Sequence, residues 1–425
     1  MNRTKTLLLT LLVLLPLTAW GVTSRVFSPS GLGELAFTAE SQPGTVPTAT
    51  GTDAIGIGDG AVAGNDVGDN AVIAIGARST ATGADSVAIG ENADATGANS
   101  IAIGGNSTDA TSADATAADA IAIGSNSLAD GAQGVAIGVR ADAGGAAAVA
   151  ISDTANASGL SAVAIGENSD ATGNNSVAIG GSSVDASSAD ATNTNAVAIG
   201  GNSLASDVDS VGLGASAVGS GNSSLAIGAN STASANRSIA IGRQTNASGA
   251  NCIAIGGNLT TTDSADCSAA DSVAIGQHIL ADDIGEFAFA SGEFATQSDA
   301  HTSIFVLRNS TTDTTQTELF ADGSAGDISV PSDCTVSFRI NVVARQTDAD
   351  GVSAGYLVIG VIDNNAGTTA LVGSVTTTTV GEDVAGWDVT ATADDTNDGI
   401  NVLVTGAVGD AVRWVARAEI VEVCG

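Results

Sequence analysis

Branched apolar residues flank an alanine in a five-residue unit that recurs along most of the chain. The unit is Ser-Val-Ala-Ile-Gly, as at 86–90 and 176–180. Its last position falls fifteen times, mostly 14 residues apart, at 58, 76, 90, 104, 124, 138, 152, 166, 180, 200, 214, 228, 242, 256 and 276. Three gaps of 20 residues themselves recur every 76 residues, which indicates duplication of a longer block. Branched residues two positions apart predict a β-strand with Val and Ile on one face.

A second short strand is predicted in each repeat, because at 93–95 two alanines alternate with an aspartate. Two strands and two turns in 14 residues make one coil of a parallel β-solenoid. We expect Val and Ile of the first strand to meet the alanines of the second strand inside the coil. A narrow interior accounts for the absence of aromatic residues from 38 to 286. Turns with positive φ are expected at recurring glycines, namely Gly83, Gly97, Gly131, Gly145, Gly159, Gly173, Gly221 and Gly249.

The opposite face of the first strand is expected to meet solvent, yet it carries no charge. Its central position is alanine or glycine in every repeat. Because monomers rarely leave a long neutral stripe exposed, we predict that this face is an interface between copies of the chain. A merely small-residue surface is the alternative. The predicted interface residues are Ala88, Ala102, Ala122, Ala136, Ala164, Ala178, Ala198, Ala226, Ala240, Ala254 and Ala274.

The two ends of the chain differ from the repeats. Residues 1–21 combine a charged start with an apolar stretch, which predicts a signal peptide, and 22–50 are expected to be a linker. We place the β-roll at 51–285 and a second domain at 286–425, which holds nearly all remaining aromatic residues. Strand-like runs separated by Gly, Asp and Asn predict an antiparallel sandwich or jelly roll, so the whole chain is all-β. The runs are 302–308, 335–344, 356–362, 370–380, 387–392, 400–405 and 412–423.

Charge and the scarcity of reactive side chains narrow the function. A net charge of −34 disfavours nucleic acid as a partner. No further apolar run is long enough to predict a membrane anchor. The two histidines, His278 and His301, lack a nearby nucleophile, and the glycines follow the repeat instead of forming a phosphate loop. We therefore expect no enzyme activity, no catalytic residue and no cofactor.

Cysteines and acidic loops leave two questions open. Cys252 with Cys267, and Cys334 with Cys424, are candidates for local disulfides, and free buried thiols are the alternative. The 20-residue coils carry acidic residues that are weak calcium candidates, with solvated loops as the alternative. These residues are Asp109, Asp114, Asp185, Asp190, Asp263 and Asp266.

The repeats Asn-Ser-Ile-Ala-Ile-Gly at 99–104 and Asn-Ser-Val-Ala-Ile-Gly at 175–180 resemble the YadA-like heads of trimeric autotransporter adhesins. The resemblance covers about 51–285. It implies a left-handed parallel β-roll that assembles as a homotrimer and attaches to a host or surface ligand, such as a glycan or a matrix protein. The stalk heptads and the membrane anchor of that family are not recognisable, so autotransport is not implied.

The second domain resembles a β-domain of tailed-phage virion and tail-fibre proteins. The resemblance is carried by the segments 303–312, 342–351, 387–393 and 412–417. It implies a module at the end of a fibre, with no catalytic residues.

Three functions are compatible with these patterns. We expect a secreted or surface-exposed trimeric adhesin-like fibre protein, which the signal peptide favours. A phage-type tail-fibre or receptor-binding structural protein is the alternative, favoured by the second domain. An ice- or mineral-binding solenoid ranks lowest, because its flat face would need ordered Thr-x-Thr columns that are missing from the repeats.

Overall fold

The computed structural model describes residues 35–37, 46–50, 52–64, 71–184, 187–258 and 264–425. They fall into two compact units, 1–164 and 165–425, and each unit is described by itself. The expected signal peptide lies outside the described residues, as does most of the expected linker. None of the described helices has the length and apolar character needed to cross a membrane.

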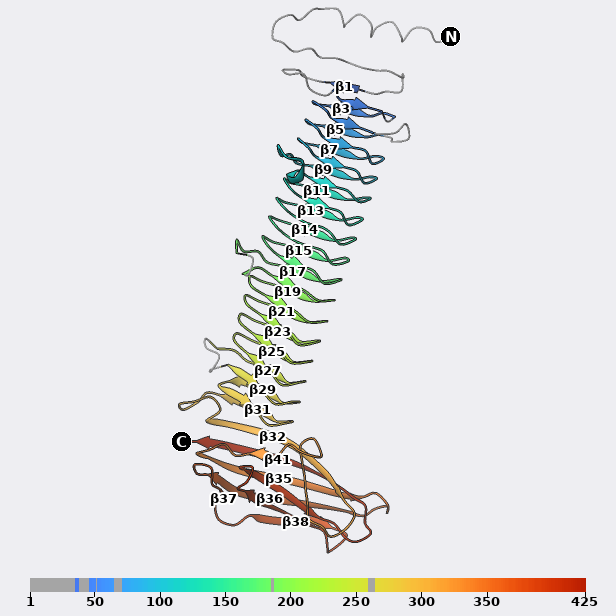
Figure 1. Cartoon of the computed structure of the whole chain (residues 1–425). Coiled ribbons are helices and arrows are strands. Elements are labelled where there is room, and N and C mark those ends of the chain that lie inside the picture. Colours follow the sequence, from blue (N-terminus) through green and yellow to red (C-terminus); the bar gives the residue numbers. More distant parts are fainter. Residues whose placement is uncertain (1–34, 38–45, 51, 65–70, 185–186, 259–263) are drawn as a thin grey trace, which may run out of the picture. The chain divides into compact units, whose positions relative to one another are not determined.

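The first unit is a parallel β-solenoid, in which coils add strands to a first and a second sheet (Figure 1). Neighbouring coils stack in register, so Ala88 lies opposite Ala102. The first sheet contains β1 (Leu35–Phe37), β3 (Ile55–Ile57), β5 (Ile73–Ile75), β7 (Val87–Ile89), β9 (Ile101–Ile103), β11 (Ile121–Ile123), β13 (Val135–Ile137) and β14 (Val149–Ile151). The second contains β2 (Thr48–Ala49), β4 (Val62–Ala63), β6 (Thr80–Ala81), β8 (Asp94–Ala95), β10 (Asp114–Ala115) and β12 (Leu128–Ala129). Because β1 and β2 pair in parallel with β3 and β4, the coils begin within the stretch expected to be a linker.

The second unit contains the same kind of solenoid, and β15 (Val163–Ile165) lies at the boundary between the units. Its first sheet contains β17 (Val177–Ile179), β19 (Val197–Ile199), β21 (Val211–Leu213), β23 (Leu225–Ile227), β25 (Ile239–Ile241), β27 (Ile253–Ile255), β29 (Val273–Gln277) and β31 (Phe287–Ser291). Its second sheet contains β16 (Asp170–Ala171), β18 (Asp190–Ala191), β20 (Leu204–Ala205), β22 (Val218–Gly219), β24 (Thr232–Ala233), β26 (Asn246–Ala247), β28 (Ala265–Cys267) and β30 (Ile279–Ala281). Parallel pairing continues through β31, six residues beyond the 285/286 boundary placed from sequence.

An antiparallel domain follows β31 in the same unit. β32 (Ala300–Thr311) pairs antiparallel with β31, so the first sheet of the solenoid continues directly into this domain. The larger sheet then adds β41 (Val412–Cys424), β35 (Cys334–Gln346), β36 (Ser353–Asn364), β37 (Thr369–Leu371) and β38 (Thr376–Glu382). A smaller sheet is formed by β33 (Thr317–Glu318), β34 (Ile328–Ser329), β39 (Asp388–Asp394) and β40 (Gly399–Thr405). The all-β prediction of parallel coils followed by antiparallel sheets is confirmed.

The core of the antiparallel domain lies between the faces of its long strands. Along β35 and β41 buried and exposed residues alternate, as expected for strands with one covered face. Trp414 is fully buried, with its ring centroid 5.7 Å from that of Trp387 and 6.4 Å from that of Tyr356. Its indole nitrogen donates a hydrogen bond to the hydroxyl of Thr311. Both tryptophans are therefore core residues, as large aromatic side chains usually are.

The interior of each coil reverses the orientation predicted for the first strand. In β7 the central Ala88 is completely buried, whereas Val87 and Ile89 point outward. The narrow gap between the two sheets of a coil is the reason for this orientation. A Cβ built on Gly56, which occupies the alanine position of β3, would lie 3.8 Å from the Cβ of Ala63. The two sheets are thus in van der Waals contact through alanines, and branched side chains do not fit at the central positions of the first strands.

The predicted interface was therefore wrong in its residues. None of the alanines in that column has any exposed surface, and they pack within their own chain instead of against another copy. They are Ala88, Ala102, Ala122, Ala136, Ala164, Ala178, Ala198, Ala226, Ala240, Ala254 and Ala274.

The turn glycines also differ from expectation. Gly83 and Gly97 do not have positive φ; they are needed for space, because a Cβ on Gly83 would lie 1.9 Å from the carbonyl oxygen of Gly97. Positive φ occurs instead at the closing glycine of the unit, such as Gly90 with φ 136°, and at short polar residues such as Asn99. The repeated glycines therefore reflect close stacking of coils at one corner and backbone conformation at the other.

Both candidate cysteine pairs are joined by disulfides. Cys252, directly before β27, and Cys267 on β28 are fully buried, with Cα atoms 6.1 Å apart, and are joined across the interior of one coil. Cys334 and Cys424 join the start of β35 to the end of its neighbour β41. Among the described residues no cysteine is free.

Candidate functional site

An uncovered apolar face runs along the first sheet of each unit. In the first unit the side chains of Ile89 and Ile137 are each 37% exposed. In the second unit Ile199 is 36% and Ile255 38% exposed, and Val197 and Ile253, two residues earlier, are partly exposed as well. Because register is kept from coil to coil, these side chains form two columns without a charged residue between them. Contiguous apolar surface of this kind marks an interaction site in soluble proteins.

The face continues beyond the coils of the second unit. β31 carries Phe287 and Phe289, whose ring centroids lie 5.8 Å apart. On the antiparallel strands beside it, Ile359 is exposed and Val421 is 63% exposed. A cavity of about 410 Å³ lies on this side, lined by Phe289, Ile359 and Val421 among others. The apolar face therefore ends at a cavity beside the aromatic side chains of β31.

Three of the described calcium candidates, Asp114, Asp190 and Asp266, lie on strands of the second sheet. Asp109 lies in a 3-10 helix, η1 (Asp109–Thr111), and Asp114 lies on β10 opposite Asp94 of β8. Burial, followed by the charge of Asp94, raises the pKa of Asp114 to about 6. Asp266 on β28 accepts a hydrogen bond from the amide of Gln297, and burial raises its pKa to about 6.

Of the other acidic candidates, the structure describes Asp190. Asp190 lies on β18 opposite Asp170, and Asp185 and Asp263 lie outside the described residues. Within the part of the chain that the structure describes, one group of three potential ligands lies close together, namely Cys334, Glu422 and Cys424. Both of its cysteines are in a disulfide, so it offers no thiolate.

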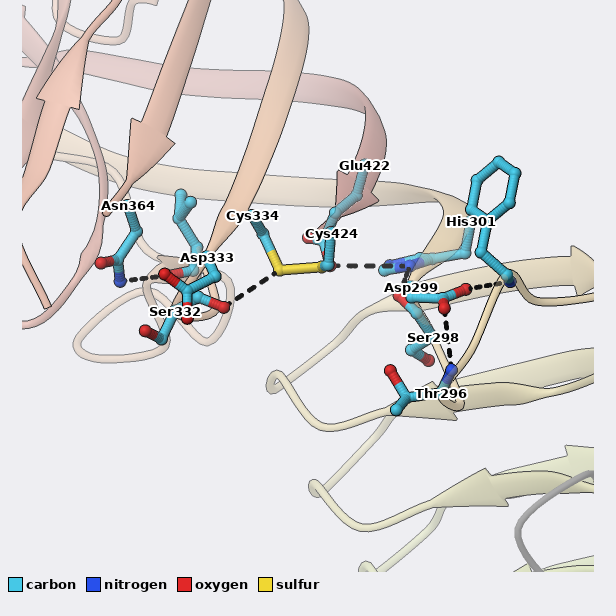
Figure 2. The surroundings of a disulfide bond; sticks show 12 residues. Thr296, Ser298, Asp299, His301, Ser332, Asp333, Cys334, Asn364, Glu422 and Cys424 are labelled. Carbon is cyan, nitrogen blue, oxygen red and sulfur yellow. Dashed lines mark hydrogen bonds and ion pairs between the residues drawn. A yellow bond between two sulfur atoms is a disulfide. The ribbon is translucent and has the colours of Figure 1, made fainter. Parts of the chain in front are cut away.

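A cavity of about 330 Å³ lies where the last coil meets the antiparallel domain. Figure 2 shows its disulfide end, with His301, Asp299 and Glu422 around Cys334–Cys424. Nδ1 of His301 lies 2.9 Å from the carbonyl oxygen of Ser298, so this nitrogen carries a proton. Glu286 and Glu422 lie on either side of the ring, each with a carboxylate oxygen 3.8 Å from one ring nitrogen. The three side chains come from the turn before β31, from β32 and from β41.

Burial disfavours charge on all three of these groups. It raises the pKa of Glu286 to about 7, against hydrogen bonds that stabilise the carboxylate. It raises the pKa of Glu422 to about 8, and the charge of Glu286 adds to this. It lowers the pKa of His301. The cavity therefore combines carboxyl groups with a histidine that remains neutral near pH 7.

Sequence reasoning did not single out Glu286 or Glu422. His301 was considered only for a nearby nucleophile, and the acidic residues are 15 before it and 121 after it in the sequence. Only the pairing of β32 with β31 and β41 brings them together. A useful signal in the sequence is Glu422 itself, a charged residue at a buried position of an alternating strand.

A second acidic group lies on the smaller sheet. Glu318 of β33, Asp327 before β34 and Asn401 of β40 each have a buried side-chain oxygen with no hydrogen-bond partner. Burial raises the pKa of Glu318 to about 7, and the charges of Asp327 and Asp394 add to this. This group is destabilised when its carboxyl groups ionise.

Comparison with known proteins agrees with the coil geometry. The YadA head domain repeat matches seven segments, at 68–93, 81–107, 115–141, 157–183, 191–219, 220–245 and 233–258. These segments lie among the coils and leave out 108–114, 142–156 and 184–190. The resemblance to YadA head repeats seen in the sequence is confirmed. No curated protein matches the chain.

Two solved structures show a weak likeness. One is tailspike protein gp49 from Acinetobacter baumannii bacteriophage Fri1, a capsular polysaccharide depolymerase, at 9% identity and a TM-score of 0.24, covering 94% of this chain and 74% of that one. The other is the tailspike protein of Acinetobacter phage vB_ApiP_P1, at 10% identity and a TM-score of 0.19, covering 92% and 80%. At such TM-scores neither likeness supports an argument about fold or activity.

Proposed function

We propose that the chain is an adhesin-like fibre protein that works outside the cell, and that its YadA head repeats assemble as a homotrimer. The observation that carries this proposal is the uncovered column of Val and Ile on the first sheet of each unit, including Ile89 and Ile199. A secreted single chain would expose this apolar surface to water. Three copies that bring their first sheets together would cover it.

The charge distribution favours the same arrangement. Aspartates such as Asp94 and Asp170 lie on the second sheet, away from the apolar columns. With the first sheets facing inward, the second sheets face outward, where repulsion between acidic chains is weakest. The corrected interface is therefore the Val and Ile face, and the alanines support it from inside each coil.

Attachment without catalysis is part of this proposal. The buried histidine His301 is flanked by Glu286, which accepts a hydrogen bond from Ser303. Ser303 has no exposed surface, so it is unable to reach a substrate. The ligand that we propose is a surface glycan or a matrix protein, and an array of both kinds probed with the purified protein would identify it.

Assembly is tested by replacing Ile199 and Ile255 with threonine, which keeps β-propensity but removes most of the apolar surface. Sedimentation of the full chain should give a trimer, and the double variant should sediment as a monomer with an unchanged β-sheet circular dichroism spectrum. Leu204→Thr on the second sheet is the matched control and should stay trimeric. A monomeric wild type, or a trimer indifferent to the isoleucine changes, would refute the interface.

A second candidate is a structural protein of a phage-type fibre. It is favoured by the antiparallel domain that continues the first sheet of the solenoid at β32, since such an arrangement suits the end of a fibre. Negative-stain images of cells and of purified virions, labelled with antibody against the chain, distinguish the two functions.

A further inference from the structure

A patch of arginines lies on the outer face of the larger antiparallel sheet. Four of the chain's 12 lysines and arginines are on its two long neighbouring strands (Figure 1). They are Arg339 and Arg345 on β35, and Arg413 and Arg417 on β41. All four residues are exposed, because they alternate with the buried residues that face the core. In a chain with a net charge of −34, this arginine patch is a local concentration of the opposite charge.

Two of these arginines face each other without a partner. Arg345 lies directly opposite Arg413 in the pairing of β35 with β41, and neither side chain forms a hydrogen bond or an ion pair with a described residue. Carboxylates of the adjoining loops accept hydrogen bonds from other groups, namely Asp348, Asp383 and Asp410. Like charges directly opposite on neighbouring strands are destabilising. An anion bound between the two guanidinium groups would remove this repulsion.

Two arginines of the solenoid show the usual alternative. Arg78 forms an ion pair with Glu91 of the next coil, and Arg140 forms one with Asp153. Acidic side chains are abundant in this chain, with 46 Asp and Glu residues, so an arginine readily finds one. The lack of an acidic partner at two opposed arginines is therefore a property of the patch and not of the chain as a whole.

Acidic residues on the same face neutralise only part of the patch. Nη2 of Arg417 lies 2.6 Å from a carboxylate oxygen of Glu419. Arg339 is opposite Glu419 in the register but forms no ion pair with any described residue. The other carboxylate on the strands of this face, Asp363, lies at the far end of β36, opposite Thr335. With four arginines and two carboxylates, the face keeps a net positive charge.

The remaining two arginines line the cavity of about 410 Å³ at the end of the apolar face. Arg339 and Arg417 share this lining with Ser337 and Phe289. A few polar groups among apolar and aromatic side chains are typical of small-ligand sites, and the volume of the cavity is within their usual range. The patch therefore joins a cavity of ligand size to a charged sheet surface.

We propose that this face binds an acidic polysaccharide through the carboxylates of its sugars. One carboxylate binds Arg339 at the cavity, and another binds between Arg345 and Arg413. The planar guanidinium group matches a carboxylate with two parallel hydrogen bonds. The exposed ring of Phe289 suits the apolar C–H face of a sugar. Arg339 and Arg345 are about 20 Å apart along β35, so the ligand is a polymer and not a single sugar.

A polysaccharide suits the charge of the whole chain better than nucleic acid does. Duplex DNA carries one negative charge per roughly 1.7 Å of its axis, and a protein with a net charge of −34 repels it strongly. A polyuronate carries at most one carboxylate per sugar, so this repulsion is weaker and a local arginine patch is able to overcome it.

A second copy of the chain suits the patch less well. Three arginine patches brought together on one axis would repel one another, because like charges placed opposite each other oppose association. In the proposed trimer the interface therefore ends before the patch, which stays accessible. This inference rests on the proposed function, attachment to a glycan, and names the chemical class of that glycan.

The test is biolayer interferometry of the full chain on immobilised alginate and polygalacturonate, which are polyuronates, and on neutral dextran, in about 0.15 M NaCl. We expect saturable binding to at least one polyuronate, weakening as salt rises, and none to dextran. The double variant Arg345→Gln, Arg413→Gln should weaken binding at least tenfold, and Arg339→Gln should weaken it as well. The matched control, Arg78→Gln with Arg140→Gln, removes two positive charges from the solenoid and should bind like the wild type.

Four outcomes would overturn the inference. The first is equal binding to a polyuronate by the wild type and the Arg345, Arg413 double variant. The second is binding to dextran as tight as to either polyuronate. The third is tighter binding to double-stranded DNA, which would assign the patch to nucleic acid. The fourth is loss of the trimer in sedimentation of the double variant, which would make the patch a contact between copies.

Failure of the proposed function gives a different result. A monomeric wild type that binds nothing on the array of glycans and matrix proteins would refute attachment by a trimeric fibre. A trimer that binds a neutral glycan or a matrix protein, but neither polyuronate, would refute this inference alone.

Discussion

Replacing Ala226 with valine should destabilise its coil more than replacing the neighbouring Leu225 with alanine. Ala226 is completely buried at the centre of β23, between Gly212 and Ala240 of the adjacent coils. Leu225 is larger but points outward and is only partly buried. In a conventional core the truncation of leucine would be the more damaging change. Which of the two substitutions lowers stability more therefore shows which face of the strand points inward.

The magnitudes follow from the width of the coil. Opposed alanine positions are already in van der Waals contact, as the 3.8 Å between a Cβ at Gly56 and that of Ala63 shows. Two extra methyl groups at Ala226 have no free space, and overpacking of this kind costs about 1–3 kcal/mol. We expect the upper end, because backbone lies on both sides. Leu225→Ala loses about 1 kcal/mol, since roughly half of a leucine is covered.

Hydrogen–deuterium exchange of the peptide 221–228 measures this difference locally, which suits a repeat structure that need not unfold in one step. A difference of about 2 kcal/mol corresponds to roughly thirty-fold faster exchange in Ala226→Val. Both variants are compared in the Ile199→Thr, Ile255→Thr background, so that assembly does not contribute. Faster exchange in Leu225→Ala than in Ala226→Val would refute the inward orientation of the alanines.

Three further results are expected. Replacing Cys252 with serine and Cys267 with alanine should lower stability by about 3 kcal/mol for a loop of 15 residues, and equal guanidinium midpoints with and without reductant would contradict this. Because the pKa of Glu318 is raised from 4.5 to about 7, the folded state holds a proton that the unfolded state releases. Stability should therefore fall as pH rises through this range. Glu318→Gln should remove that part of the fall in Tm between pH 5 and pH 8. Gly360→Ala should lower Tm by several degrees, since its Cβ would lie 2.4 Å from a phenylalanine ring, and an unchanged Tm would show that the ring moves aside.

The period of the repeat was sufficient to predict parallel coils, because a 14-residue spacing with two strands leaves few other arrangements. It was not sufficient to orient them. Alternation in Val87, Ala88 and Ile89 shows which residues share a face, but the direction of that face depends on the distance between the two sheets. The usual preference for branched residues inside gave the wrong answer, since the space between the central positions of the two strands is filled by alanine or glycine.

The cavity shows a different limit of sequence reasoning. Glu286 and Glu422 are separated by most of the antiparallel domain, and their meeting depends on the order of strands in the larger sheet. The hydrophobic pattern predicted the strands of that domain without fixing their neighbours. A buried charged position in an alternating strand is a clue that becomes informative only when the partner strand is known.

The longer coils have a practical consequence for changing the protein. Ala102 pairs with Ala122 in register although 20 residues separate them, so the six additional residues leave the stack at one corner and do not disturb it. That corner, near η1, is a place where evolution has already inserted sequence without altering the faces of the coil. It is therefore suited to carrying foreign peptides, at spacings set by how many coils lie between the chosen insertions.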